Sequence, residues 1–518
     1  MSTVKKSTSS KKYNIRMNWL AALAAIPISL GIQMVDTPFN WLLLVPIFYI
    51  CLDASRKQIL IRASIFGTTA SVINFFWLMD AISRYSQTGY LAGILMILAF
   101  ALFFSVYASL IGLVYYYLIP KNRNYKSYWF FACLAGGSLG VLLDWSMEHF
   151  GSGFAMCLYL NYIPAATNLY AIQPASLGGP FVITFFGAML NYLIAEFIKS
   201  RQWKMLMIPF GGLILYLGWG AIILHSYQQK EPKYQQKTIK ATVLSENMLP
   251  EESWNESNGN QIARDYFQLE QIAIKSNSQL ALWSESAVPW SFRTDDDFLK
   301  AIDSLSAPAG VTHLIGINTE VGKNAFYNSI YCVNPGMKIS GRYDKRIALY
   351  LAEKPLWGLS LPFLTFGKQE YKEGTSNAPL RTPYGYAGMV LCNESVLTQP
   401  AWSSVREGAN FLVNPGNDGW FAQTYVSRLH FYYARMRAVE TRKDIVINNN
   451  NGFSGLIKST GEIAMKENNE GPKAFVVDIT PNTYQPLALK VSNFFVISAL
   501  VCFIAVSLFN ILVIKKRQ

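Results

Sequence analysis

The sequence predicts a polytopic α-helical membrane protein with eight transmembrane helices and one extracytoplasmic α/β domain. Of its 518 residues, 51% are hydrophobic and only 15% are charged, whereas a soluble chain carries about a quarter charged residues. Seven apolar runs precede residue 226 and one lies near the end of the chain. Between the last two runs the pattern changes to short strands that alternate with amphipathic helices. A disordered chain is excluded, because it would be poor in apolar residues.

The apolar runs have about the length that a bilayer-spanning helix requires. We expect spans at roughly 17–34, 39–53, 62–82, 90–118, 127–147, 173–197, 205–225 and 491–514. Residues 17–226 are therefore a predicted seven-helix bundle, and residues 491–514 are a predicted eighth helix. The first run could instead be a cleaved signal peptide, but no clear A-x-A site follows it.

Basic residues alternate between the two ends of these spans, which predicts the orientation of the chain. Seventeen lie in the tails 1–16 and 515–518 and in every second loop, whereas the short opposite loops contain only Arg84. Both termini are thus expected in the cytoplasm and residues 236–485 outside it. The formal net charge of +13 results from this asymmetry, because the other 28 Lys and Arg residues face 32 Asp and Glu. Nucleic acid is not an expected partner.

The six cysteines are too few and too scattered for a disulfide framework. Only Cys332 and Cys392 belong to the outer domain, where an oxidising compartment would allow them to pair. The four histidines lack the spacing of metal ligands, so no metal site is expected.

The outer domain is predicted to be an α/β domain. Helices are expected at Gln261–Ser276 and Thr424–Arg442, and a hairpin at Gly455–Ile463. Strands are expected at Ile239–Leu244, Leu280–Trp283, Thr312–Ile317, Ser329–Val333, Gly388–Leu391, Phe411–Val413, Ile445–Ile447 and Phe475–Ile479.

Three short stretches of this domain carry reactive side chains. Glu285 follows the apolar strand that ends at Trp283, Lys345 lies just past a strand in Gly341–Arg346, and Cys392 follows the apolar run Met389-Val390-Leu391. Singly, each has an ordinary explanation as a loop, surface or core residue.

Together, in the order Glu, Lys, Cys after strand ends, they resemble the nitrilase, or carbon–nitrogen hydrolase, superfamily. The stretches Asn414–Phe421 and His430–Glu440 are similar to the loop and helix that follow the cysteine in that superfamily. A domain of this kind between seven helices and a last one resembles the apolipoprotein N-acyltransferase family. The resemblance implies an α-β-β-α sandwich for the outer domain.

The resemblance also implies roles for individual residues. Cys392 would be the nucleophile, Glu285 its general base, and Lys345 the cation that stabilises the oxyanion. Glu353 matches the second glutamate of the family, which would orient Lys345 or the incoming amine. Glu394 and Trp254 match positions that shape the site.

The implied reaction is a ping-pong acyl transfer with no cofactor. Cys392 would take an acyl chain from a membrane phospholipid as a thioester and pass it to the α-amino group of a diacylated apolipoprotein. The implied location is the bacterial inner membrane, with the catalytic domain in the periplasm. We expect a monomer.

The segment Leu356–Phe366 is unusually apolar for a loop and follows the lysine. It is predicted to be a lid that dips into the membrane interface through Trp357 and Phe363. The alternative is that it packs on the core of its own domain.

The sequence departs from the family pattern at Ser245-Glu246-Asn247, at Asn393 and at Leu349–Glu353. These departures leave open a membrane-tethered amidohydrolase or a family member with a different acceptor. A transporter or receptor is a further alternative, although Asp80, Asp144 and Glu196 lie near the ends of predicted spans.

Overall fold

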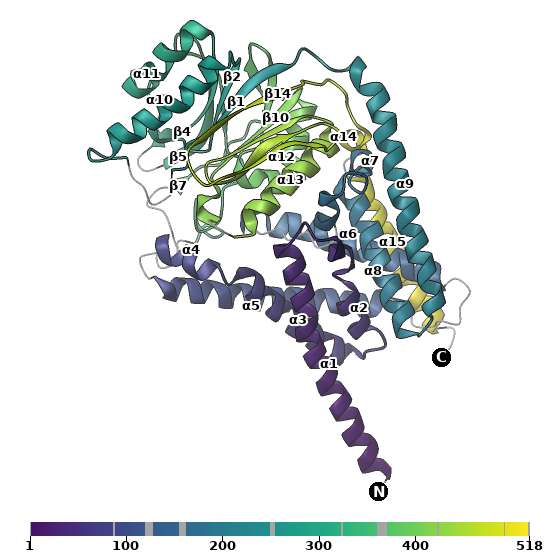
Figure 1. Ribbon diagram of the computed structural model, residues 1–518. Helices are drawn as coiled ribbons and strands as arrows, with labels where there is room; N and C mark the ends of the chain where they lie inside the picture. Colours follow the sequence, from purple (N-terminus) through teal and green to yellow (C-terminus); the bar gives the residue numbers. More distant parts are fainter. Residues whose placement is uncertain are drawn as a thin grey trace.

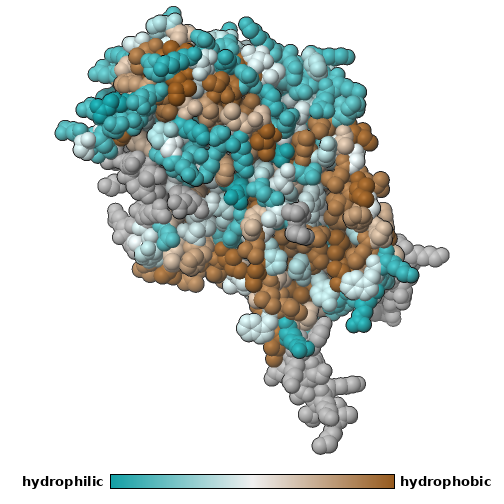
Figure 2. Space-filling model, viewed as in Figure 1, coloured by the Kyte–Doolittle hydropathy of each residue, from teal (hydrophilic) through white to brown (hydrophobic). Residues whose placement is uncertain are grey.

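The computed structural model describes residues 2–85, 89–119, 128–154, 162–248, 254–322, 325–359, 370–421, 424–491 and 493–515. A helical bundle carries a layered α/β domain at one end (Figure 1). Helix α1 begins, and helix α15 ends, on the side of the bundle away from that domain. Figure 2 shows hydrophobic side chains over much of the bundle and mostly hydrophilic ones over the α/β domain. The surface therefore separates a part suited to lipid from a part suited to water.

The bundle is built from apolar helices of unequal length. Its helices are α1 (Ser2–Gln33), α2 (Val45–Cys51), α3 (Arg56–Phe75), α4 (Leu78–Tyr85), α5 (Tyr90–Leu118), α6 (Tyr128–Phe150), α7 (Ala175–Gly178), α8 (Pro180–Lys199), α9 (Met207–Lys230) and α15 (Phe494–Lys515). Five described stretches are long and apolar enough to cross a membrane: Asn14–Gln33, Tyr90–Leu118, Tyr128–Phe150, Pro180–Lys199 and Trp203–Lys233. Asn40–Cys51 and Phe494–Asn510 are shorter apolar helical stretches.

The structure corrects the predicted span at 62–82. Helix α3 ends at Phe75, and α4 is a separate short helix. Leu78 and Ile82 of α4 are buried, whereas Asp80 is exposed. A helix with one apolar face and one charged face packs along a surface and does not cross a bilayer alone, which is why the hydropathy pattern overestimated this span.

The α/β domain contains two sheets. The larger has the strand order β14-β1-β2-β4-β5-β6, with β3 paired to β4 and β7 to β5; the smaller has the order β13-β12-β11-β10-β9-β8. The strands are β1 (Ile239–Ser245), β2 (Leu280–Trp283), β3 (Val288–Ser291), β4 (Thr312–Gly322), β5 (Ala325–Asn334), β6 (Lys338–Asp344), β7 (Glu370–Tyr371), β8 (Leu380–Thr382), β9 (Gly385–Met389), β10 (Phe411–Gly416), β11 (Ile445–Asn449), β12 (Gly452–Ile457), β13 (Ile463–Asn469) and β14 (Lys473–Ile479).

The two sheets face each other, and helices cover their outer faces (Figure 1). Side chains such as Leu282 and Val413 fill the space between the sheets. The larger sheet is covered by α10 (Gly259–Lys275) and α11 (Asp297–Ser306), the smaller by α12 (Thr398–Arg406) and α13 (Val426–Thr441). The short helix α14 (Leu487–Val491) leads to α15. This confirms the expected α-β-β-α sandwich.

Helix α13 packs against both the smaller sheet and the bundle. Its Tyr432 and Met436 belong to one buried cluster with Ile28 of α1 and Met147 of α6. The side chain of Arg435 donates to the carbonyl of Ala166 at 2.9 Å. Because both faces of α13 are covered, almost the whole helix is buried, and the smaller sheet is held firmly over the bundle.

Candidate active site

The three predicted reactive residues follow strand ends on two different sheets. Glu285 comes two residues after β2 and Lys345 directly after β6, both in the larger sheet. Cys392 begins the 3-10 helix η7 (Cys392–Val396), which follows β9 of the smaller sheet. All three side chains are buried. The structure brings them together where the two sheets meet.

Lys345 lies between two carboxylates. Its Nζ is 3.1 Å from Oε1 of Glu285 and 2.9 Å from Oε1 of Glu353. The second oxygen of Glu353 accepts from the backbone N–H of Leu349 at 2.7 Å. Burial alone would lower the pKa of Lys345, but the Glu285 and Glu353 carboxylates raise it well above its ordinary value. The two carboxylates therefore favour a charged ammonium beside the buried cysteine.

Cys392 is a neutral thiol in the resting site. Burial raises the pKa of the thiol, the Glu285 carboxylate raises it further, and the Lys345 ammonium opposes both. The backbone of Cys392 has φ 53°, a left-handed conformation that costs about 1–3 kcal/mol in a non-glycine residue. The Asn414 amide donates to the carbonyls of Cys392, at 3.3 Å, and of Val390. These contacts hold the sulfur at a sharp turn.

Glu394 ties the loop after β6 to the turn that carries Cys392. Its carboxylate accepts from the Tyr343 hydroxyl at 2.6 Å and from the backbone N–H groups of Arg346 at 2.6 Å and Leu391 at 2.8 Å. Since Lys345 lies between Tyr343 and Arg346, Glu394 fixes the lysine loop relative to the turn that carries Cys392.

Trp254 lies in an aromatic cluster on the outer face of the larger sheet. Its ring centroid is 5.6 Å from that of Tyr266 and 5.0 Å from that of Trp290. Tyr266 in turn stacks on Trp283 and donates to the carbonyl of Ala287 at 2.5 Å. Trp254 thus reaches the Glu285 segment through Tyr266, and its part in shaping the site stays a prediction.

The predicted lid is described only in its first part. Trp357 is 71% exposed, and its ring lies 6.0 Å from Tyr350 and 6.3 Å from Phe154. Leu356 packs on a cluster that includes Phe75 of α3. Phe363 lies outside the described residues. The described part therefore packs on the bundle and leaves an exposed tryptophan beside it.

Sequence reasoning assigned no role to two groups at the site, although one of them, Asp418, lies in the stretch Asn414–Phe421 that it singled out. Asn328 of β5 donates to Oε1 of Glu285 at 2.8 Å. The feature of the sequence that could have pointed to it is a polar residue directly before the predicted strand Ser329–Val333. Asp418 pairs with His430 at 2.8 Å and raises the pKa of Cys392. Both residues are distant from the triad in sequence, so only the fold brings them there.

Two of the residues that depart from the family pattern, Glu246 and Asn393, form hydrogen bonds with neighbouring loops of the site. Glu246 accepts from the Ser284 hydroxyl at 2.5 Å, beside Glu285, and burial raises its pKa to about 7. The Asn393 amide donates to the carbonyl of Ile347 at 3.3 Å. Both contacts support the loops that carry Glu285 and Lys345.

Cys332 and Cys392 are both free thiols, so the disulfide that was considered possible between them is not present. Within the described ranges, no group of three His, Cys, Asp or Glu residues is arranged to hold a metal ion.

Two sheets between helical layers, with a Glu, a Lys and a Cys where they meet, define a nitrilase-type domain. Residues 230–488, half of the chain, match the family model described as Carbon-nitrogen hydrolase. The chain therefore belongs to the carbon–nitrogen hydrolase family. Among solved structures it is similar to the carbon–nitrogen hydrolase from Helicobacter pylori G27, with a TM-score of 0.37 and 17% identity, over 50% of this chain and 92% of that one.

The helical part identifies the branch of the family. Residues 20–193 match the Apolipoprotein N-acyltransferase N-terminal domain. Two relatives are named Apolipoprotein N-acyltransferase. The one from Methylococcus capsulatus is 24% identical over 468 residues, 85% of this chain and 86% of its own. The one from Geobacter metallireducens is 22% identical over 449 residues, 82% of each chain. The two matched domains together are those of the apolipoprotein N-acyltransferases.

Proposed function

We propose that this protein is a phospholipid:apolipoprotein N-acyltransferase. It moves an acyl chain from a membrane phospholipid, through a thioester on Cys392, to the free α-amino group of the diacylglyceryl-cysteine at the N-terminus of a lipoprotein. One observation carries the proposal: a buried ammonium held by two carboxylates lies beside a buried cysteine, in a domain that packs directly on an apolar helical bundle.

In the first half-reaction Glu285 takes the thiol proton as the Cys392 sulfur attacks the carbonyl carbon of the phospholipid ester. The tetrahedral intermediate carries an oxyanion, which the Lys345 ammonium stabilises; one well-placed donor contributes about 3 kcal/mol. When the carbon–oxygen bond breaks, Glu285 returns the proton to the leaving alkoxide. The products are a lysophospholipid and the thioester.

In the second half-reaction the lipoprotein amine attacks the thioester carbon. Glu285 takes a proton from the nitrogen, Lys345 again stabilises the oxyanion, and the thiolate leaves and recovers the proton. Glu353 holds Lys345 in place through both steps. Since the three side chains are buried, the site limits the access of water to the thioester.

We further propose the orientation predicted from the basic residues. The bundle and α15 span the bacterial inner membrane, both termini lie in the cytoplasm, and residues 236–485 lie in the periplasm. The start of α1 and the end of α15 on the side away from the α/β domain support this orientation (Figure 1). In this placement Trp357 acts as part of the lid at the interface. The protein acts as a monomer.

The proposal is tested by the intact mass of the purified protein after incubation with phospholipid. We expect an acyl adduct that hydroxylamine removes, that Cys392→Ser abolishes and that Cys332→Ser retains. Absence of the adduct during turnover would overturn the thioester. If the acyl adduct is only hydrolysed, even when a diacylated lipopeptide is present, the amidohydrolase alternative would be favoured.

A further inference from the structure

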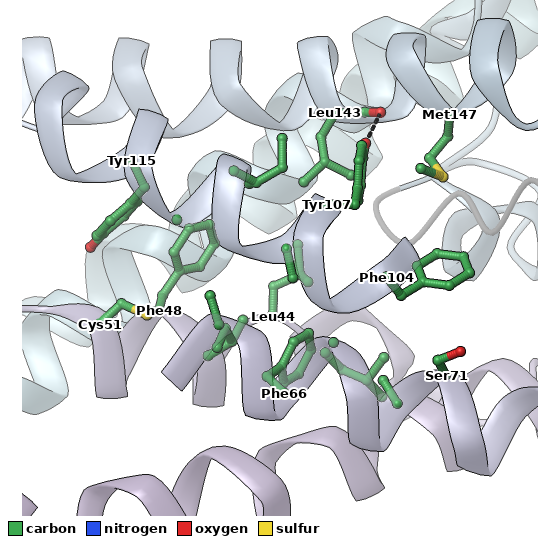
Figure 3. Close-up of a pocket in the computed structure, with 18 of the residues that line it drawn as sticks. Leu44, Phe48, Cys51, Phe66, Ser71, Phe104, Tyr107, Tyr115, Leu143 and Met147 are labelled. Atoms are coloured by element: carbon green, nitrogen blue, oxygen red, sulfur yellow. Dashed lines mark hydrogen bonds between the residues drawn. The ribbon is translucent and has the colours of Figure 1, made fainter. Parts of the chain in front are cut away.

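The turn that carries Cys392 and the loop that carries Glu285 are held from different sides. Val396 and Leu397, which follow the nucleophile along the chain, share one buried cluster with Met147 of α6. Figure 3 shows Met147 among the side chains that line an apolar cavity of about 160 Å³ inside the bundle. The nucleophile is therefore supported by the bundle, whereas the general base is held by its neighbours in the α/β domain.

The loop between β2 and β3 carries the general base on a constrained backbone. Ser286 has φ 52°, a left-handed conformation that is strained in a residue other than glycine. A β-carbon on Gly316 of β4 would lie 2.1 Å from the carbonyl oxygen of Ser284, so the loop packs directly on this strand. The Tyr266 hydroxyl holds the other end of the loop, because it donates to the carbonyl of Ala287 at 2.5 Å. A strained loop keeps its shape only while such anchors hold.

Glu246, the residue directly after β1, anchors the first residue of this loop twice. Its Oε2 accepts from the Ser284 hydroxyl at 2.5 Å, and its Oε1 accepts from the Ser284 backbone N–H at 3.3 Å. Glu246 is only 5% exposed, so water competes little for either bond. Because both bonds end on the residue immediately before Glu285, they fix the direction in which the loop leaves β2.

The strength of this anchor depends on the charge of Glu246. An ionised carboxylate accepts with both oxygens, and hydrogen bonds to a charged acceptor are about twice as strong as neutral ones. A neutral carboxyl, or an amide in its place, accepts the backbone N–H with one oxygen and donates to the hydroxyl with its own hydrogen. Both contacts then remain, but they are weaker.

Burial raises the pKa of Glu246 to about 7, and the two bonds from Ser284 oppose this rise. The titratable groups that α10, the loop after β2 and the end of β14 place around it are Tyr266, Glu285 and Lys473. Burial raises the pKa of Tyr266 well above its ordinary value, and Lys473 pairs with Glu467. The charge of Glu246 therefore changes near pH 7.

We infer that Glu246 is a positioning residue: through Ser284, its carboxylate holds Glu285 in the geometry that proton transfer from Cys392 requires. The inference rests on the proposed function for the role of Glu285, and it gives a task to a residue that departs from the family pattern. Ionisation of Glu246 strengthens the anchor and also places a charge in the interior of the fold. The same ionisation therefore improves the position of the base and lowers the stability of the domain.

The test is the rate at which phosphatidylethanolamine in detergent micelles acylates Cys392 of the full-length protein, followed by intact mass at pH 6 and pH 8.5. Glu246→Gln keeps both contacts without the charge, and Glu246→Ala removes both. Glu270→Gln is the matched control, because Glu270 is a second buried carboxylate of the same domain, 3.8 Å from His313, and burial raises its pKa to about 8. The thermal midpoints of all four proteins are measured at the same two pH values.

We expect the wild type to be acylated as fast as Glu246→Gln at pH 6 and about fivefold faster at pH 8.5. Comparing two proteins at one pH cancels the other ionisations of the site. Glu246→Ala should be about tenfold slower than Glu246→Gln at both pH values; if it does not fold, the glutamine variant alone decides.

Stability should change in the opposite direction to the rate. At pH 8.5 the thermal midpoints of Glu246→Gln and Glu270→Gln should both exceed that of the wild type, because each variant removes a buried charge, while Glu270→Gln keeps the wild-type rate. The same ratio of wild-type to Glu246→Gln rates at both pH values would overturn the inference. A slower Glu246→Gln that is also less stable than the wild type at pH 8.5 would overturn it too, because a purely structural role predicts that result.

Alkylation of Cys392 by iodoacetamide, read by peptide mass, separates this inference from the proposed function. It also requires removal of the thiol proton, but it uses no phospholipid. Slower alkylation of Glu246→Gln at pH 8.5 alone, with no acyl adduct on the wild type, would keep the positioning role and refute the proposed function. An acyl adduct on the wild type, with both reactions equally fast in Glu246→Gln, would do the reverse.

Discussion

Replacing Lys345 with Met removes both of the roles that we propose for this lysine, the stabilisation of the oxyanion and the balancing of two buried carboxylates. The ammonium is 3.1 Å from Glu285 and 2.9 Å from Glu353, and it is only 3% exposed. Removing one member of a buried ionic cluster costs about 3–5 kcal/mol of folding free energy. Removing an oxyanion donor slows the chemical step by about 10²–10³-fold. We expect both effects in Lys345→Met.

The double variant Lys345→Met/Glu353→Gln tells the two roles apart. It removes one positive and one negative charge, so the thermal midpoint in detergent should recover in part while acylation, followed by intact mass, stays slow. Lys372→Met is the control, because Lys372 is about half exposed and pairs with the similarly exposed Glu370, a kind of pair that contributes at most about 1 kcal/mol. Wild-type acylation rates in the double variant would refute the role given to Lys345.

Three further predictions concern other residues. Burial raises the pKa of Glu270 from 4.5 to about 8. The folded state is therefore stabilised by the neutral carboxyl below pH 4.5, and this stabilisation is lost as the pH rises to 8. The loss in the free energy of unfolding is about 5 kcal/mol. Thermal midpoints between pH 5 and 9 should therefore fall less in Glu270→Leu than in the wild type; parallel curves would contradict this. Glu148 of α6 accepts from the N–H of Thr398 at 2.8 Å, just after the nucleophile turn. Glu148→Ala should slow acylation and lower stability by about 1–3 kcal/mol, whereas Glu148→Gln should retain most of both; equal losses in the two variants would count against the contact. Trp357→Ser should weaken the use of phospholipid without lowering the thermal midpoint, and unchanged kinetics with phospholipid would refute the lid.

Much of the fold could be predicted because its determinants are local. Apolar runs indicated the helical region, and short apolar stretches indicated strands such as Leu280–Trp283, which the structure contains with the same bounds. The span at 62–82 was predicted to end too late, because hydropathy averages over α3 and α4 and does not detect the break after Phe75. Short edge strands such as β8 were missed, since three residues carry too little pattern.

The residues of the candidate site could be proposed from the sequence, but their contacts could not. Glu285, Lys345 and Cys392 were predicted because each follows a strand end and their order matches a known family. The pairing of Lys345 with both Glu285 and Glu353 depends on two sheets meeting face to face, and no local pattern encodes that. Asn328 was missed for the same reason: its hydrogen bond to Glu285 crosses from β5 to the loop after β2.

The most direct test of the central claim is a chase of the isolated acyl-enzyme. The protein is loaded with an isotopically labelled acyl chain from phospholipid, freed of donor, and mixed with a synthetic diacylated lipopeptide. We predict that the label leaves Cys392 and appears on the α-amino group of the peptide in equal amount. Release of the label as free fatty acid, or peptide acylation only when phospholipid is added again, would contradict a thioester on Cys392 as the carrier of the transferred chain.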